Sequence, residues 1–371
     1  MNPALRPDPP STTAPVRTPV GIAVVGIGAF AREHLVALAA LPGADVRWVV
    51  GHDLARARAL AALVPGARAT TSLDDALDDD AVHAVDVVTA TPAHARDTIA
   101  AGAAGKHVQV EKPAALSLDR LDAMVAATEG RGTTLVVGQT VRFQPAVAAL
   151  AAAARRGEIG TPRLAHVSWY TGHAWPGGWR GWQLDPELSG GHPVHNGTHI
   201  MDVATWLLDD EPVEVFARGF RTFSPEMESP DSFHVQLRTA SGALATLELC
   251  YALRRRGELV RRLVLVGTEG TLAHSTIEED GLHSDATTAP PVSVEGALGL
   301  QLAHWLDVVR GEAAPVVTTP QFRAALATAL AAQRSLVSGR RERVADVPGY
   351  TPVPDGGTHP GVPARPAGVA A

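Results

Sequence analysis

The feature that most constrains the fold is an apolar run, Val20 to Val25, that leads directly into glycines and then into a helical pattern from Phe30 to Ala40. Apolar runs and helical patterns go on alternating, at Val46 to Val50, Leu54 to Leu63, Val85 to Ala90, Thr98 to Ala104, Val108 to Val110, Leu118 to Thr128 and Thr134 to Val137. Strands that alternate with helices pair in parallel through crossovers, and nearly continuous apolar strands indicate a sheet covered on both faces. The alternation within residues 20–141 therefore predicts a doubly wound parallel α/β domain.

After about Arg142 the rhythm changes, because strand patterns now follow one another with turn residues between them. The predicted strands are Leu164 to Tyr170, Val213 to Phe220, Phe233 to Thr239, Ala243 to Tyr251, Arg262 to Val266 and Thr271 to His274, and the helical patterns are Ile200 to Leu208, Gly299 to Arg310 and Gln321 to Val337. Consecutive strands favour antiparallel pairing. Residues 142–345 therefore predict an α+β domain with an open, mainly antiparallel sheet. We expect a flexible extension over the Pro-rich residues 1–19 and a tail over the Pro/Gly-rich residues 346–371.

The composition excludes several functional classes. The chain has 371 residues, 46% of them hydrophobic, and a formal net charge of -7, whereas nucleic-acid-binding domains are usually basic. Cys250 is the single cysteine, which excludes an internal disulfide framework. No export signal is visible, and no apolar stretch reaches the roughly 20 residues that cross a bilayer. We expect a cytoplasmic protein that binds neither nucleic acid nor membranes.

The first strand runs into a GxGxxA pattern that opens a helix. In this pattern Gly26 permits the tight turn, Gly28 lets the backbone approach a pyrophosphate, and the small Ala31 allows close packing of helix on strand. Ala29 and Phe30 complete the turn, and the phosphates would lie at the helix N-terminus. This context predicts a Rossmann domain that binds NAD or NADP.

The end of the second strand carries no acidic residue for the adenosine ribose, since glycine stands at position 51 where the acid is expected. His52 and Arg56 are candidates to face a 2'-phosphate, although Arg56 is equally explained as a solvated helix residue. Asp53 is either a cofactor contact or only a helix N-cap. The sequence leaves the choice between NAD and NADP open, and Gly51 predicts weak discrimination.

Several ordered motifs carry a family resemblance. Gly105 to Pro113 reads GKHVQVEKP, and it is accompanied by Thr91-Pro92, Gly138 to Pro145, Ser189 to Gly191 and His195 to Asp202. This set resembles the glucose-fructose oxidoreductase, inositol dehydrogenase and rhizopine catabolism (Gfo/Idh/MocA) family, from Gly21 to about Val344. The resemblance implies a Rossmann domain followed by an open sheet that forms one wall of the active site. It also implies a homodimer or homotetramer held together through that sheet.

The resemblance implies that Lys112 reaches both the nicotinamide and the substrate, with Glu111, Pro113 and the Thr91-Pro92 segment shaping the cofactor site. An ammonium group suits that place on chemical grounds, because an alcohol develops alkoxide character as hydride leaves. Lys112 stands at the end of a buried-type strand, where α/β ligands bind. The Lys112-Pro113 bond is a candidate cis peptide.

The second motif of the family resembles DxGxHxxD, and here it reads His195-Asn196-Gly197-Thr198-His199-Ile200-Met201-Asp202. His199 carries over as the proton acceptor, and Asp202 is expected to cap or orient the helix. His195 replaces the family's aspartate, so we expect it to contact substrate as a hydrogen-bond donor. The spacing of three histidines, at 192, 195 and 199, would suit a metal site if they shared one face of a helix. Pro193 and Gly197 argue against one continuous helix through them. We expect no metal.

Aromatic residues concentrate between residues 169 and 182, where Trp169, Trp179 and Trp182 are candidates to contact a sugar ring. A packed hydrophobic cluster or a subunit contact explains them equally well. Arg142 is a candidate substrate donor, or else an interdomain ion-pair partner.

The leading functional hypothesis is an NAD(P)-dependent oxidoreductase acting on a CH-OH group of a sugar, polyol or related compound. A glycosidase that retains NAD, as some members of the resembled family do, and a non-catalytic NAD(P)-binding protein are the alternatives.

Overall fold

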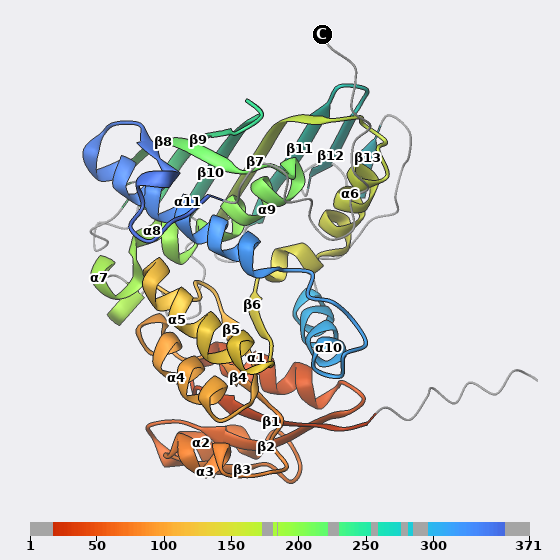
Figure 1. The fold of residues 1–371 in the computed structure, drawn as a ribbon, viewed down its shortest axis with the longest axis vertical. Coiled ribbons are helices and arrows are strands. Elements are labelled where there is room, and N and C mark those ends of the chain that lie inside the picture. The colour runs from red at the N-terminus through yellow and green to blue at the C-terminus, as the bar shows by residue number, and fades with distance from the viewer. Residues whose placement is uncertain are drawn as a thin grey trace, which may run out of the picture.

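The first sheet has six parallel strands in the order β3-β2-β1-β4-β5-β6 (Figure 1). The computed structural model describes residues 18–172, 181–183, 185–221, 230–253, 259–275, 281–284 and 296–352. The strands are β1 Val20–Val25, β2 Ala44–Val50, β3 Arg68–Thr70, β4 Ala84–Val87, β5 His107–Glu111 and β6 Leu135–Gly138. The strand order reverses between β1 and β4, which is where ligands of such sheets bind. The predicted Rossmann fold is confirmed.

Side-chain caps and a proline set where helices of this domain begin. Asp53 accepts hydrogen bonds from the first amides of α2, and Ser117 does the same for α5. Thr91 and Pro92 open α4, whereas the helical pattern in the sequence began at Thr98; proline fits a first helical turn because its missing N–H would be unpaired there. The helices are α1 Ala29–Ala39, α2 Leu54–Ala61, α3 Leu73–Leu77, α4 Thr91–Ala103, α5 Leu118–Thr128 and the 3-10 turn Glu129–Arg131.

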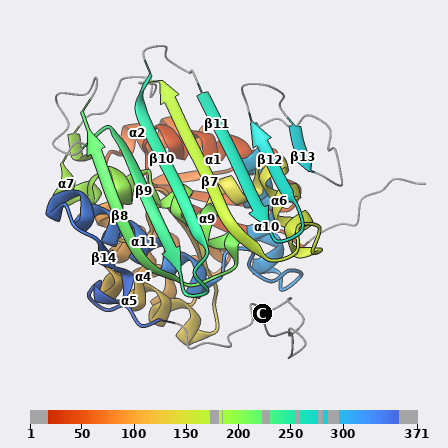
Figure 2. The same cartoon turned by 90° about the horizontal axis from the view of Figure 1, so that it is seen from above.

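The second sheet has eight strands in the order β13-β12-β11-β7-β10-β9-β8-β14. Its strands are β7 Pro162–Gly172, β8 Pro212–Phe220, β9 Ser232–Thr239, β10 Leu244–Leu253, β11 Leu259–Gly267, β12 Thr271–Ser275, β13 Gly281–Ser284 and β14 Glu342–Arg343. β7 and β10 pair in parallel, and the other pairs are antiparallel. The predicted mainly antiparallel sheet is confirmed. Figure 2 shows its open outer face.

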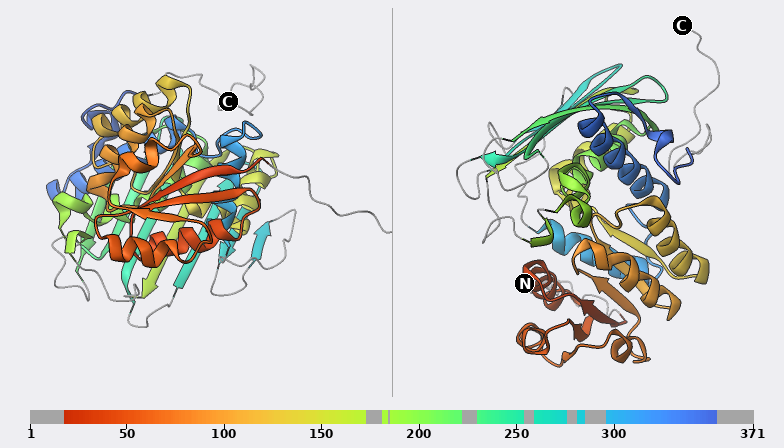
Figure 3. Two further views of the ribbon diagram at one scale, coloured as in Figure 1. Left: turned by 90° about the horizontal axis from the view of Figure 1, so that it is seen from below. Right: turned by 90° about the vertical axis from the view of Figure 1, so that its left-hand side faces the viewer.

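In the described ranges, helices cover only the inner face of this sheet. They lie between it and the Rossmann domain, as the side view in Figure 3 shows. Along β10 buried and more exposed residues alternate, which is the period-2 pattern of a strand packed on one face. The helices are α6 Pro145–Arg155, α7 Pro186–Ser189, α8 Gly191–His195, α9 Thr198–Leu208 and α11 Thr319–Ser338, with 3-10 turns at Thr140–Phe143, Gly181–Gln183 and Val344–Asp346. Among the described residues no helix is both long and apolar enough to span a membrane.

One helix leaves the second domain and completes the first. α10, Ala297–Val309, packs its Leu302, Trp305 and Leu306 side chains into a core with β1 and α1. Trp305 is fully buried there. The division predicted at residues 141 and 142 places α10 with the second domain, while its buried face packs on β1 and α1 of the first. Sheets of α/β domains are covered on both faces, and α10 supplies part of that cover.

A buried polar network lies beneath the glycine turn. His34 of α1 contacts Asp86 of β4, with Nδ1 and Oδ2 2.8 Å apart, and its Nε2 is 3.5 Å from Oε1 of Glu111. Gln109 donates to the second Asp86 oxygen at 3.0 Å and accepts from Gln301 of α10 at 3.3 Å. Burial by itself lowers the pKa of His34, but the two carboxylates raise that pKa to about 10. A protonated imidazole therefore joins α1, β4 and the end of β5.

We predict that this imidazole makes the protein less stable in alkali. The pKa of His34 is near 6.5 in the unfolded chain and about 10 in the folded one. Its contribution is therefore complete below pH 6.5 and is lost between pH 6.5 and 10, at up to about 1.4 kcal/mol per pH unit. Urea unfolding at pH 7, 8.5 and 10 measures this loss. His34→Gln should be less stable at pH 7 and should lose less stability with rising pH; equal pH slopes for both proteins would contradict the prediction.

Candidate active site

The turn between β1 and α1 is open where a dinucleotide phosphate would lie. Gly26 has a φ of 138°, and a Cβ there would meet the Val88 carbonyl oxygen at 2.6 Å. A Cβ on Gly28 would have no heavy atom of the described residues within 4 Å. Gly28 directly precedes α1, and Ala31 is fully buried under the turn. The unpaired amides and the positive dipole end of α1 favour an anion, so the turn fits the pyrophosphate of a dinucleotide.

The adenosine side of this site is shaped by packing. A Cβ on Gly51 would lie 2.2 Å from Cγ2 of Ile27, so the Ile27 side chain requires glycine there. The Asp53 carboxylate accepts from the amides of residues 55 and 56 at 2.9 and 3.1 Å, which makes it the N-cap of α2. Arg56 turns back from α2, and its Nη2 donates to the Ile27 carbonyl at 3.0 Å. Arg56 therefore lies beside the glycine turn, while His52 is exposed.

We expect Arg56→Ala to weaken NADP binding about tenfold while leaving NAD binding nearly unchanged, because a guanidinium binds a 2'-phosphate more strongly than a hydroxyl. Arg58 is an exposed arginine of the same helix, so Arg58→Ala is the matched control. Calorimetric titration of both dinucleotides measures the effect. Equal losses for NAD and NADP, or the same NADP loss in Arg58→Ala, would remove Arg56 from the ribose site.

Lys112 lies at the same edge of the sheet as the glycine turn. β1, β4 and β5 are neighbouring parallel strands, so Gly26 and Lys112 follow strand ends on one side. The Lys112-Pro113 peptide bond is cis. Oε2 of the buried Glu111 accepts from the Lys112 amide at 3.2 Å. Burial lowers the pKa of Lys112, and the nearby Glu111 partly opposes this. The ammonium group is thus held at the ligand-binding edge and releases its proton more readily than an exposed lysine.

His195 contributes its backbone as well as its ring. Its carbonyl oxygen accepts a hydrogen bond from Nζ of Lys112 at 3.1 Å. The ring packs edge-on against Trp182, with centroids 5.1 Å apart. Burial, and next the charge of Lys112, lower the pKa of His195 well below its usual value, so the ring is neutral at pH 7. The carbonyl contact was missed in the sequence because a backbone group has no residue signature. Substrate contact by the ring stays a prediction.

The three histidines do not share one helix. α8 ends at His195 and α9 begins at Thr198, and a Cβ on Gly197 would lie 2.4 Å from the Pro193 carbonyl oxygen. This close approach allows the chain to change direction between the two helices. Across the ranges that the structure describes, no three His, Cys, Asp or Glu side chains gather as a metal site would require.

His199 is oriented by Gln139, which follows β6. Nδ1 of His199 lies 3.0 Å from Oε1 of Gln139, and the Gln139 amide nitrogen is directed to Oγ1 of Thr198 at 3.4 Å. An amide oxygen accepts, so Nδ1 carries the proton and Nε2 keeps its lone pair. Burial, followed by the charges of Lys112 and Arg261, lowers the pKa of His199 well below its usual value. The neutral amide of Gln139 thus sets the tautomer of His199. The family resemblance implies an aspartate near this histidine, at the position that His195 occupies here.

We predict that Gln139 tunes proton transfer at His199. Gln139→Leu should lower kcat about tenfold or more because the imidazole loses its fixed tautomer. Gln139→Glu should instead raise the pKa of His199 and move the acidic limb of the kcat/KM profile upward by about one pH unit or more. Steady-state kinetics between pH 5 and 9 test both variants. An unshifted profile in Gln139→Glu together with wild-type kcat in Gln139→Leu would contradict the role.

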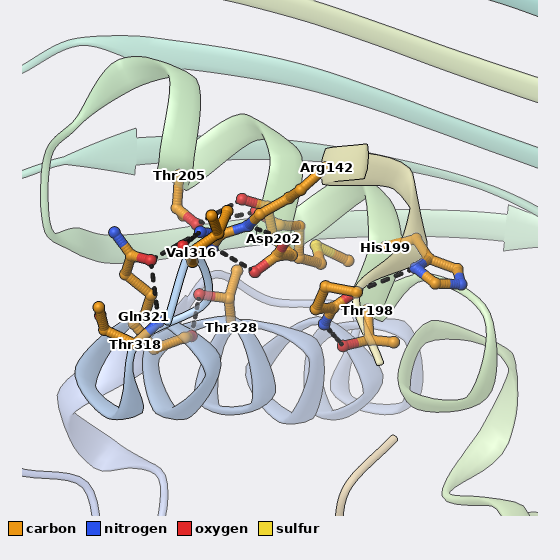
Figure 4. A network of polar contacts seen from close by, with 12 residues as sticks. Arg142, Thr198, His199, Asp202, Thr205, Val316, Thr318, Gln321 and Thr328 are labelled. Atoms are coloured by element: carbon orange, nitrogen blue, oxygen red, sulfur yellow. Dashed lines mark hydrogen bonds and ion pairs between the residues drawn. The ribbon is translucent and has the colours of Figure 1, made fainter. Parts of the chain in front are cut away.

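Arg142 and Asp202 form a buried bidentate ion pair (Figure 4). Nε and Nη2 of Arg142 donate to the two Asp202 oxygens at 2.7 Å each, and Nη1 donates to Gln321 and to the Val316 carbonyl at 2.6 and 3.1 Å. Neither charged side chain reaches solvent. Of the two roles that the sequence left open for Arg142, the structure shows the ion pair, with Asp202 as the partner. Asp202 orients α9 through this pair and does not cap it.

Trp169 stacks with His199, with centroids 5.7 Å apart and 17° between the ring planes. On β11, Arg261 places its guanidinium carbon 3.6 Å from the Trp169 centroid. Arg261 was not predicted as a site residue, because the strand predicted there began at Arg262 and the pairing of Arg261 with Trp169 exists only in the sheet. Trp182 packs on His195, while Trp179 lies outside the described residues.

Comparison with known proteins identifies both domains. Residues 20–139 match the model described as the oxidoreductase family, NAD-binding Rossmann fold, and residues 147–273 match the GFO/IDH/MocA C-terminal domain. An inositol 2-dehydrogenase of Acidothermus cellulolyticus is 31% identical over 85% of this chain and 92% of that protein. The chain belongs to the Gfo/Idh/MocA oxidoreductase family. Its first domain is accordingly an NAD-binding Rossmann domain.

Other members of the Gfo/Idh/MocA family match over most of the chain. D-apiose dehydrogenase of Paraburkholderia graminis is 29% identical and covers 82% of this chain and 84% of that protein. The crystal structure of GenD2 from gentamicin A biosynthesis, in complex with NAD, superposes with a TM-score of 0.77 at 27% identity, covering 92% of this chain and 99% of the other.

Proposed function

We propose that the protein is an NAD(P)-dependent oxidoreductase that transfers a hydride between nicotinamide and a secondary alcohol or ketone of a sugar, polyol or related compound. The observation that carries the proposal is the hydrogen bond from Nζ of Lys112 to the His195 carbonyl, which ties the lysine to the segment that carries His199. The charge of Lys112 also lowers the pKa of His199. Bound NAD or NADP supplies the hydride acceptor or donor. The names of the related dehydrogenases support the choice of a sugar or polyol.

The side chains divide the chemistry between them. The Lys112 ammonium group, held by the His195 carbonyl, stabilises negative charge on the reacting oxygen. His199, with Nδ1 held by Gln139, takes the hydroxyl proton on Nε2. Trp182 offers an apolar ring to the substrate, whereas Trp169 is stacked on His199 and lies beneath the Arg261 guanidinium. The outer face of the second sheet is the proposed contact of a homodimer or homotetramer.

We predict that Lys112→Ala lowers kcat by about 10² or more while dinucleotide binding is retained, because the phosphates are held by the glycine turn. His199→Ala should mainly lower kcat, whereas His195→Ala should mainly raise KM and broaden substrate choice. The measurement is cofactor absorbance during turnover of a sugar and polyol panel, with cofactor binding titrated separately. Near-normal kcat in Lys112→Ala would exclude it from the mechanism, and a kcat loss in His195→Ala equal to that in His199→Ala would make His195 a proton-relay residue.

The same assay separates the other enzyme class. Net change of cofactor absorbance in proportion to product supports the dehydrogenase. Cleavage of a glycoside without net cofactor turnover would instead support a glycosidase, and binding of cofactor without any turnover would support a non-catalytic protein.

A further inference from the structure

Glu111, the last residue of β5, connects Lys112 to the core of the Rossmann domain. Its Oε2 accepts a hydrogen bond from the Lys112 amide at 3.2 Å, and its Oε1 lies 3.5 Å from Nε2 of His34. A Cβ on Gly138, at the end of β6, would lie 2.3 Å from Oε1, so the carboxylate occupies the space that this glycine leaves open. The side chain that supports Lys112 is therefore enclosed by α1 and β6.

The negative charge of Glu111 acts on Lys112. Burial lowers the pKa of Lys112, and Glu111 opposes that effect. The rings that feel the positive charge of Lys112 have their own pKa values lowered by burial, so they are neutral at pH 7; they are His192, His195 and His199. Within the described residues, Glu111 is thus the group whose charge favours the ammonium form of Lys112.

His34 lies between two buried carboxylates. Nδ1 is 2.8 Å from Oδ2 of Asp86, and Nε2 faces Oε1 of Glu111 on the other side. Neither Nε2 nor that Glu111 oxygen has another hydrogen-bond partner in the part of the chain that the structure describes. A neutral ring donates one hydrogen bond and would turn a lone pair toward the second carboxylate, whereas an imidazolium donates to both. The geometry therefore favours the imidazolium, and a pKa of about 10 for His34 agrees with it.

We propose that His34 is a positioning residue for the reaction: its imidazolium keeps the Glu111 carboxylate ionised and in place, and Glu111 in turn holds the backbone of Lys112 and favours its ammonium form. His34 is fully buried and acts through Glu111. Its ring also packs edge-on against Phe30 of the glycine turn, with centroids 4.8 Å apart, so one side chain contacts both the cofactor turn and the support of Lys112. The role of Lys112 in the reaction rests on the proposed function, whereas the effect of His34 on Lys112 does not.

The titration of Lys112 measures this effect without a substrate. The chain has two lysines, Lys106 and Lys112, so protein made with isotope-labelled lysine gives two side-chain Nζ signals in NMR spectra, and Lys106→Arg assigns them. In His34→Gln we expect the pKa of Lys112 to fall by about one unit or more, because a buried Glu111 that has lost its cation takes up a proton. Thermal unfolding verifies that each variant is folded.

A second variant tests whether His34 acts through Glu111. Glu111→Gln removes the charge directly and should lower the pKa of Lys112 by a similar amount. The double variant should show no further fall, since two residues that act through one contact do not add. Thr128→Val is the matched control: Thr128 is a fully buried polar residue of α5 whose hydroxyl donates to the Met124 carbonyl, so its loss removes a buried hydrogen bond without changing a charge.

The charge of His34 is also measurable in the wild-type protein, so the proposal does not depend on a variant that folds. NMR of protein made with isotope-labelled histidine should show an imidazolium at about pH 8.5, where an exposed histidine is neutral. Absence of an imidazolium there, an unchanged Lys112 titration in folded His34→Gln, or a further fall in the double variant overturns the proposal. The same fall in Thr128→Val also overturns it, because the effect would then be one of stability.

Turnover separates this proposal from the proposed function. In His34→Gln the alkaline limb of the kcat profile, which would follow the Lys112 proton, should move to lower pH by the same amount as the Lys112 titration. A shifted titration with an alkaline limb that stays in place upholds the effect of His34 on Lys112 and counts against Lys112 in the proposed function. A shifted limb with an unshifted titration overturns the positioning role and leaves the oxidoreductase standing.

Discussion

The ion pair between Arg142 and Asp202 joins the two halves of the candidate site. Arg142 follows β6 of the first sheet, Asp202 lies on the helix that begins beside His199, and Gln321 ties the same guanidinium to α11. A bidentate pair with no solvent exposure tolerates little displacement, because removing or moving one partner leaves a buried charge uncompensated. The position of His199 relative to Lys112 therefore depends on a contact that touches neither the reacting atoms nor the cofactor site.

Around His199 the chain uses neutral groups where a charge would be expected. Gln139 sets the tautomer without adding negative charge, and the neighbouring His195 is kept neutral by burial and by Lys112. The carboxylate of Glu111 accepts a hydrogen bond from the backbone amide of Lys112, and its other oxygen faces the protonated His34 ring.

Periodicity and turn chemistry predicted most of the fold, and the exceptions have physical reasons. β3 and β14, with three and two residues, are too short to show a pattern. α4 begins at Thr91, before the predicted start at Thr98, because Pro92 suits a first helical turn. α10 was predicted as a helix but not as part of the Rossmann core. The reason is that a hydrophobic helix face indicates burial but does not indicate which sheet the helix packs on.

By itself the sequence determined the Rossmann domain, the glycine turn, the Lys112-Pro113 turn and the candidate histidines, because each is encoded by residues close together in the chain. Only the tertiary structure decided the partners: Gln139 for His199, Asp202 for Arg142, Trp169 for Arg261, and Ile27 over Gly51. Most of these contacts join residues that are 60 or more positions apart, and Gly51 and Ile27 meet only where two neighbouring strands end side by side. Local patterns specify which elements form, whereas packing between elements decides which side chains meet and therefore which charges and tautomers the site presents.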